Sequence, residues 1–281
     1  MGFCGESSAL RIACAAIHFG EEPPVTGSGG SGAVFITGCS LHCGFCQNAQ
    51  ISHNGMGQEV STVEFVNICL ALQQSGAENI NIVTGSHAAP AVALGIECAK
   101  KNGLTIPCLW NSSAYESISA LDVIQDIADS YLPDLKTLNK ETAQKYLTAQ
   151  DYPLAAKNAI TKMIKTKKNV IIRHLVLPDH LEDTKNVFWW IAENAASNVK
   201  ISLMTQYTPI KNNHSKSTMP NRFLNEGEYE TVLKWLDEFG IKGFFQELVT
   251  NSAWLPDFSK TKSFPSSLSK TVWHWKDGFC S

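Results

Sequence analysis

The sequence has no excess of basic residues, no long apolar run and no internal repeat. It carries 23 Lys and Arg against 26 Asp and Glu, a formal net charge of −3, so binding of nucleic acid through bulk electrostatic attraction is not expected. No apolar segment reaches the roughly 18 residues of a membrane-spanning helix. The opening residues MGFCGESSAL contain none of the Lys or Arg that begin a signal peptide. These absences predict a cytoplasmic protein that binds neither nucleic acid nor a membrane.

The sequence also lacks the even, regularly spaced cysteines of a disulfide-stabilised fold. Its nine cysteines are odd in number, and most lie in apolar segments, where free thiols of a reducing compartment are expected. A second metal cluster built from Cys4, Cys14 and Cys280 is not expected. The one dense group is a trio between residues 37 and 50.

Strand-like and helical patterns alternate along most of the chain, which predicts parallel β/α units and a partial (β/α)6 barrel. Residues 33–249 are expected to form this barrel, with residues 1–32 and 250–281 as extensions that pack on it. The expected strands are 33–37, 79–84, 104–110, 130–136, 169–177, 199–207 and 243–248. The expected helices are 62–75, 89–101, 152–166, 184–196 and 226–240. In such a barrel the functional site lies at the carboxyl ends of the strands.

The segment TGCSLHCGFCQNAQ, residues 37–50, places Cys39, Cys43 and Cys46 at the spacing C-x3-C-x2-C after the first of these strands. Thiolates bind zinc or iron–sulfur clusters. A structural zinc ion takes four protein ligands, and His42 or His53 could supply the fourth. A [4Fe–4S] cluster has four irons, so three cysteines leave one iron open to a substrate or cofactor. Nucleophilic catalysis by one thiol would leave the other two unexplained, so the spacing indicates a metal site of one of these kinds.

This motif after the first strand of a β/α barrel resembles the radical S-adenosylmethionine (SAM) superfamily, and the aromatic Phe45 before the third cysteine is typical of it. The chain is similar in particular to the pyruvate formate-lyase activating enzyme-like proteins, in the branch called PflX-like. The likeness covers roughly residues 18–258. It is carried by HFGEEPPVTGSGGSGAVFITGCSLHCGFCQNAQISH, NIVTGSHAAPAV, WNSSAYES, YLPDLKTLN, VIIRHLVLPDHLEDT, ISLMTQYTPI and FFQELVTNSAWLPDF.

The resemblance implies that Cys39, Cys43 and Cys46 hold a [4Fe–4S] cluster whose open iron binds SAM. In such enzymes reductive cleavage of SAM gives a 5′-deoxyadenosyl radical that abstracts hydrogen, while the protein supplies positioning and excludes water. An electron donor such as a flavodoxin or ferredoxin is implied, and the family name suggests a glycine of a partner protein as the substrate. Action on a small molecule or another peptide is an open alternative. So is a binding protein stabilised by zinc on the same cysteines and a histidine.

The resemblance assigns contacts with SAM to the loops after the second and third expected strands. Where the activating enzymes carry Gly-Gly-Glu-Pro, this chain reads VTGSHAAP, so Thr84, Gly85 and Ser86 are expected to contact SAM through their backbone. Where those enzymes carry Asp-Thr-Asn-Gly, the chain has polar residues at Asn111 and Ser113, which are expected to contact SAM. The aspartate that helps to bind a monovalent cation there is absent.

Three later segments complete the implied SAM site. The family's Asp-Leu-Lys is intact from Asp134 to Lys136, and the Lys136 ammonium is expected to meet the SAM carboxylate. Arg173 matches a strand arginine near that carboxylate, and a charge within an apolar strand needs such a partner. Gln206 stands where the activating enzymes often place a SAM-contacting histidine. The hydroxyl of Tyr207 fits the cavity or the core equally well.

Overall fold

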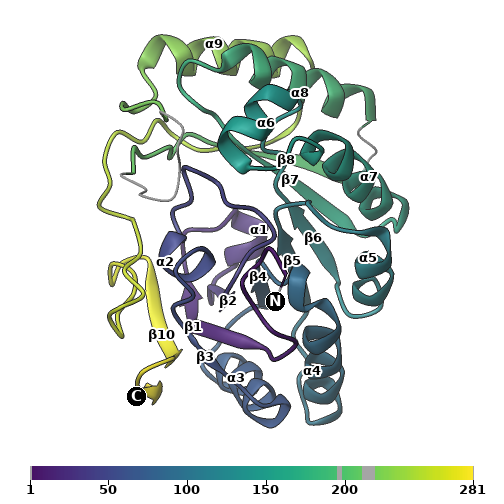
Figure 1. Cartoon of the computed structure of the whole chain (residues 1–281), viewed down its shortest axis with the longest axis vertical. Coiled ribbons are helices and arrows are strands. Elements are labelled where there is room, and N and C mark those ends of the chain that lie inside the picture. The colour runs from purple at the N-terminus through teal and green to yellow at the C-terminus, as the bar shows by residue number, and fades with distance from the viewer. Residues whose placement is uncertain (1, 195–197, 211–218, 281) are drawn as a thin grey trace.

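The computed structural model describes residues 2–194, 198–210 and 219–280. They form one open, curved sheet whose strand order is β11-β10-β1-β2-β4-β5-β6-β7-β8-β9 (Figure 1). In the described part of the chain, the two end strands of this order do not pair with each other. The barrel is therefore partial.

Seven strands of this sheet run parallel, from β2 to β9. Helices connect successive strands, so the described residues contain six β/α units and a short seventh strand. This confirms the predicted (β/α)6 barrel. The bounds are β2 (Ser31–Ile36), β4 (Ile80–Val83), β5 (Cys108–Ser112), β6 (Ser130–Pro133), β7 (Asn169–Leu175), β8 (Val199–Met204) and β9 (Gly243–Phe245).

The longer helices lie around the outside of the sheet (Figure 1). The side chains of Ser61, Ser117, Asn139 and Asn225 cap four of them by accepting a backbone N–H of the first turn. The helices are α3 (Thr62–Gln74), α4 (Ala89–Lys101), α5 (Ile118–Ile124), α6 (Lys140–Leu147), α7 (Tyr152–Lys165), α8 (Leu181–Asn194) and α9 (Glu226–Glu238). No helix in the described ranges is long and apolar enough to span a bilayer.

The terminal segments extend the sheet with antiparallel strands. β1 (Arg11–His18) pairs with β2, with β10 (Ser269–His274) and with β3 (Gln58–Glu59), and β11 (Gly278–Phe279) pairs with β10. In Figure 1 the yellow C-terminal strand β10 lies beside the purple β1. Phe258 is fully buried and packs against Phe35 of β2, with ring centroids 5.3 Å apart. Both ends of the described chain therefore stabilise the first parallel strand.

The expected bounds of five elements are wrong by three residues or more. β5 begins at Cys108 instead of residue 104, because the backbone N–H groups of Thr105 and Ile106 donate to the Gln73 side chain and Pro107 has no N–H. Three strands end three residues earlier than expected: β6 at Pro133, β8 at Met204 and β9 at Phe245. The sequence prediction also omits α5 and α6. The expected helix 184–196 begins earlier, at Leu181, and its last two residues lie outside the described ranges.

A short helix, α1 (Pro23–Thr26), enters the interior of the barrel. Its Val25 packs against Leu109 of β5, Leu132 of β6 and Ile171 of β7. The Asn79 side chain donates a hydrogen bond to the Val25 carbonyl at 2.7 Å. This segment fills the barrel below the carboxyl ends of the strands, so the space for a site lies above it.

Candidate functional site

The three clustered cysteines lie on an irregular loop between β2 and α2 (Ala49–Ser52). The loop is fixed by the end of α6, because the N–H of His42 donates to the carbonyl of Leu147 and the N–H of Gly44 to that of Tyr146. Carbonyls in the last turn of a helix have no partner within the helix. The cysteine loop therefore uses hydrogen-bond acceptors that α6 leaves open.

Gly38, directly before Cys39, is required by the backbone. Its φ of +86° lies in the left-handed region, where residues other than glycine are strained. A Cβ atom there would lie 2.4 Å from Cγ of Glu6 and 3.0 Å from the Cys4 carbonyl oxygen. The N-terminal segment is thus packed directly against the start of the cysteine loop.

The three thiols are enclosed by protein. Burial raises the pKa of Cys39 to about 12 and also raises the pKa of Cys43 and of Cys46. The Lys136 ammonium has the opposite effect and lowers the pKa of all three thiols, by less than burial raises it. Buried thiols with raised pKa values are poor nucleophiles, and thiolate ligands form there as a metal binds and releases their protons.

The chemistry of the donor set can be compared with the two kinds of metal site that the sequence leaves open. Within the described ranges, no group of three or more Cys, His, Asp or Glu side chains is arranged to hold a single metal ion. A structural zinc ion takes four protein ligands, whereas a [4Fe–4S] cluster held by three cysteines keeps one iron open for a further ligand. Three thiols on one loop therefore fit a [4Fe–4S] cluster.

The loops after β4 and β5 lie together, and Thr84 has a positive φ of 64°. Its N–H donates to the Asn111 carbonyl at 2.9 Å. Gly85 is close to Trp110, since a Cβ atom would lie 2.8 Å from that ring. The structure thus brings together Thr84, Gly85 and Asn111, and their contact with SAM stays a prediction.

A buried carboxylate joins these two loops. Glu116 accepts hydrogen bonds from the Ser86 hydroxyl at 2.7 Å, the Trp110 indole at 2.7 Å and the Ser112 hydroxyl at 2.9 Å. Burial outweighs these three donors and raises the pKa of Glu116. His87, in the same loop as Ser86, is 2.8 Å from the Thr37 carbonyl through Nε2. Its ring therefore lies against the end of β2.

Lys136 and Asp134 form an ion pair at 2.5 Å. Their side chains are 17% and 23% exposed. Burial lowers the pKa of Lys136, but the Asp134 carboxylate and Cys43 outweigh it, so the net shift is upward and the side chain is a cation. A cation and an anion thus face the cysteine loop side by side.

Arg173 has protein partners. The sequence predicts the SAM carboxylate as the partner of this charge, whereas the structure gives it Glu21 and Glu22, at the start of α1. Its Nε donates to Glu22 at 2.9 Å and its terminal nitrogen to both glutamates. Arg173 therefore holds the α1 segment inside the barrel, and a contact with SAM stays a prediction.

Gln206 follows β8 and lies beside the cysteine loop. Gln47, directly after Cys46, donates to the Gln206 carbonyl at 3.0 Å, and Gln246 donates to its side-chain oxygen at 2.8 Å. Tyr207 is a core residue, because it is 1% exposed and its hydroxyl donates to the Pro220 carbonyl at 2.7 Å. Of the two, only Gln206 is placed toward the candidate site.

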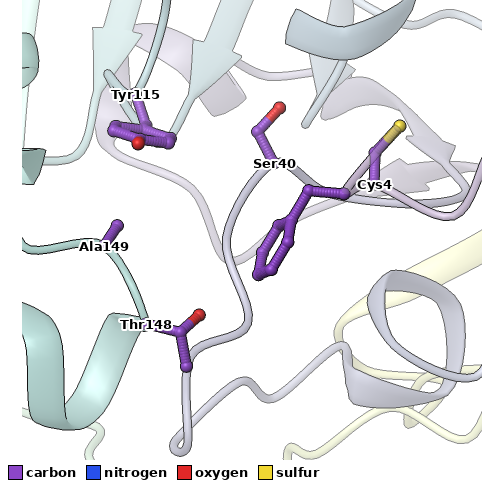
Figure 2. A pocket seen from close by; sticks show the side chains of 6 residues that line it. Cys4, Ser40, Tyr115, Thr148 and Ala149 are labelled. Carbon is purple, nitrogen blue, oxygen red and sulfur yellow. The ribbon is translucent and has the colours of Figure 1, made fainter.

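A pocket of about 290 Å³ lies beside the cysteine loop. Figure 2 shows its lining side chains. They come from the N-terminal segment, the cysteine loop, the loop after β5 and the turn after α6, and none is charged. These are Phe3, Cys4, Ser40, Tyr115, Thr148 and Ala149. Ser40 is the neighbour of Cys39, so the pocket reaches the loop that carries the thiols.

Residues 33–188 match the family described as the radical SAM superfamily. The chain belongs to the radical SAM superfamily. Membership implies a [4Fe–4S] cluster and SAM, in agreement with the donor set of the cysteine loop. The match includes the three cysteines, the loops after β4 and β5, and the Asp134–Lys136 pair, so the described geometry is that of a radical SAM domain.

Three relatives place this radical SAM domain among known proteins. It is 28% identical over 236 residues to the uncharacterized protein MJ0674 of Methanocaldococcus jannaschii, covering 80% of this chain and 66% of the relative. It is similar in fold to the FeFe-hydrogenase maturase HydG from Carboxydothermus hydrogenoformans, with a TM-score of 0.58, 14% identity, and coverage of 76% and 52%. It is also similar to Streptococcus suis SuiB bound to its precursor peptide SuiA, with a TM-score of 0.51, 12% identity, and coverage of 74% and 46%. The chain thus spans less than two thirds of each.

Sequence reasoning missed two buried side chains that join the loops of this radical SAM domain. Glu116 lies in WNSSAYES, one of the segments that carry the family resemblance. Nothing in the sequence, however, shows that three uncharged hydrogen-bond donors surround its carboxylate. Tyr152 is the first residue of the expected helix 152–166, and it is fully buried. Its hydroxyl, however, contacts backbone atoms of the Asp134–Lys136 segment. Periodicity finds such a residue but does not show where its polar atom points.

Proposed function

We propose that this chain is an enzyme that cleaves SAM reductively at a [4Fe–4S] cluster held by Cys39, Cys43 and Cys46, and uses the product radical to abstract hydrogen. One observation carries the proposal: three thiols on one loop, two of them buried and one half-buried, face an ion pair at the carboxyl ends of parallel strands. When bound, the cluster supplies the electron that breaks a carbon–sulfur bond of SAM and yields a 5′-deoxyadenosyl radical.

The residues around the loop suit the amino-acid part of SAM, which is a zwitterion. The Lys136 ammonium can bind the carboxylate of SAM, and the Asp134 carboxylate can bind the amino group of SAM. The two side chains form an ion pair with an N–O distance of 2.5 Å. Because both side chains are mostly buried, these contacts are screened little by water. Polar groups from Thr84, Gly85, Asn111 and Ser113 line the neighbouring loops. We assign SAM orientation to this set together with the buried Phe45, which precedes the third cysteine.

We assign a peptide or protein segment as the substrate. The uncharged pocket beside Ser40 can admit a neutral residue of a peptide, and the fold is similar to that of SuiB, whose structure was solved with a precursor peptide. A glycine of a partner protein, as in the activating enzymes and the PflX-like branch, is one such segment. A flavodoxin or ferredoxin is the proposed electron donor. The free cysteines are consistent with a reducing cytoplasm.

Anaerobic reconstitution tests the reaction. The protein is loaded with iron and sulfide, SAM and dithionite are added, and 5′-deoxyadenosine is measured. Cys43→Ala is expected to abolish the product while the fold is kept. The matched control is Cys69→Ala, which removes another buried thiol, from α3, and is expected to leave the product unchanged. Full activity of Cys43→Ala, or a single bound zinc in place of iron, would contradict the proposal.

Deuterium transfer tests the substrate. The reconstituted enzyme is incubated with proteins from cells grown on α-deuterated glycine, and separately with the small-molecule fraction of the same cells. Deuterium in 5′-deoxyadenosine from the protein fraction identifies a glycine as the hydrogen donor. Stimulation of SAM cleavage only by the small-molecule fraction would contradict a peptide substrate.

A further inference from the structure

Tyr152 connects the loops after β5 and β6 through one hydroxyl group. It is the first residue of α7, and its side chain is fully buried. The hydroxyl oxygen lies 2.7 Å from the Asp134 carbonyl, 3.1 Å from the Ser113 carbonyl and 2.9 Å from the N–H of Lys136. Three backbone groups of predicted SAM contacts therefore meet at one atom.

Donor and acceptor roles at this atom follow from its chemistry. A phenol has one hydrogen to donate and lone pairs to accept. The hydroxyl accepts the N–H of Lys136 and donates to the Asp134 carbonyl, the nearer of the two carbonyls, with the Ser113 carbonyl as a second acceptor. Burial raises the pKa of Tyr152, and the Lys136 ammonium lowers it by less. The phenol therefore stays protonated and keeps its hydrogen for this role.

The contact completes the support of the segment from Asp134 to Lys136. The N–H of Asp134 donates to the backbone carbonyl of Ser112 in β5, and the N–H of Leu135 donates to the backbone carbonyl of Arg173 in β7. These bonds hold the first two residues to the neighbouring strands. The N–H of Lys136 has Tyr152 as its partner. The direction in which the lysine side chain leaves the strand is thus set by the tyrosine hydroxyl.

We propose that Tyr152 is a positioning residue for SAM, which aims the Lys136 ammonium at the cysteine loop and holds the Ser113 backbone beside it. This inference rests on the proposed function, because it needs SAM to bind at that ion pair. Tyr152 acts through Lys136, because its own hydroxyl is already hydrogen-bonded to backbone groups. Loss of the hydroxyl weakens SAM binding and leaves the cysteine ligands in place.

The test compares Tyr152→Phe with Tyr131→Phe in the reconstituted, dithionite-reduced protein. Tyr131 is the matched control, because its ring is also buried and its hydroxyl bonds to Thr166, away from the ion pair. SAM is titrated while the electron paramagnetic resonance spectrum of the cluster is recorded. We expect the half-saturating SAM concentration to rise about three- to thirtyfold in Tyr152→Phe, and not in Tyr131→Phe. The Michaelis constant for SAM should rise in parallel, with a smaller change in the turnover number.

A double-mutant cycle with Lys136→Ala separates positioning from general loosening of the fold. If Tyr152 acts through the lysine, the loss in the double variant is smaller than the product of the two single losses. Equal half-saturation in Tyr152→Phe and the wild type, or independent losses in the cycle, would overturn the inference. A wild-type cluster whose spectrum does not respond to SAM would instead reject the proposed function.

Discussion

Glu116 is a buried acid, and none of its hydrogen-bond donors in the described part of the chain is a cation. Its three donors, from Ser86, Trp110 and Ser112, are all uncharged. Such donors stabilise a carboxylate less than burial destabilises it, which is why its pKa is raised. The folded protein therefore binds this proton more tightly than the unfolded chain does.

The raised pKa predicts how Glu116→Gln changes stability with pH. The stability that the protonated acid provides is fully present below the pKa of the unfolded chain, and it is lost as pH rises through the higher pKa of the fold. The amide does not ionise, and its nitrogen can donate to the Ser112 hydroxyl. Glu116→Gln should therefore gain stability relative to the wild type as pH rises. Urea unfolding at pH 4 and pH 8 measures this, and a pH-independent difference would count against an ionising Glu116.

Single residues also show the limit of sequence reasoning. The cysteine spacing and the intact Asp134–Lys136 segment could be found, because each is a short pattern tied to one chemistry. The role of Glu116 could not be found, because its donors come from the loop after β4 and from strand β5, which meet only in the fold. The same is true of Arg173: the sequence predicts a need for a partner, but it does not show that Glu21 and Glu22 meet it.

Among the elements, strands and helices with strong periodicity were predictable, and those that depend on tertiary contacts were not. α3, α4, α7 and α9 were predicted to within two residues at each end. β1 was not, although it is buried almost throughout. Its sequence RIACAAIH contains three small alanines, which carry little strand signal. β1 is therefore stabilised by its pairing with β2 and β10 more than by the strand propensity of its own residues.

The start of α9 gives a prediction at this scale. Glu228 forms a capping box with Asn225 and accepts two hydrogen bonds from Arg222 at 2.7 Å. The Arg222 guanidinium is the main cause that lowers the pKa of Glu228 to about 2. The stability from this pair is present above the unfolded pKa near 4.5 and is lost as pH falls toward 2.

Glu228→Gln keeps a side chain that can complete the capping box and removes the charge. The pair is partly solvated, so we expect a loss of less than about 1 kcal/mol at pH 7 that disappears near pH 2. Asn225→Ala is the control, since it removes the cap itself and should cost about 1 kcal/mol at both pH values. Thermal unfolding across this range measures both. An equal loss for Glu228→Gln at pH 7 and pH 2 would show that the ion pair contributes nothing.

For the whole molecule, the parallel direction of the strands explains why the site could be located. The loops after β2, β4, β5 and β6 belong to distant parts of the sequence. Because parallel strands bring their carboxyl ends to one edge, the cysteines, Thr84, Asn111 and Asp134 had to lie at that edge together. The filling of the barrel below them was not predictable, since it depends on residues 18–26 folding back inside the sheet.

That inner segment gives the last prediction. Arg173 is 7% exposed and Glu22 is 7% exposed, and the guanidinium outweighs burial to lower the pKa of Glu22. Arg173→Met keeps most of the side-chain volume but leaves two glutamates uncompensated inside the barrel, which should cost about 3–5 kcal/mol. Adding Glu21→Gln and Glu22→Gln removes the buried charges, so the triple variant should recover much of this loss. Urea unfolding without SAM measures it, because the proposed role is to hold α1. If Arg173→Met were as stable as the wild type, α1 would be held by the packing of Val25 and the Asn79 hydrogen bond, without a contribution from the ion pairs.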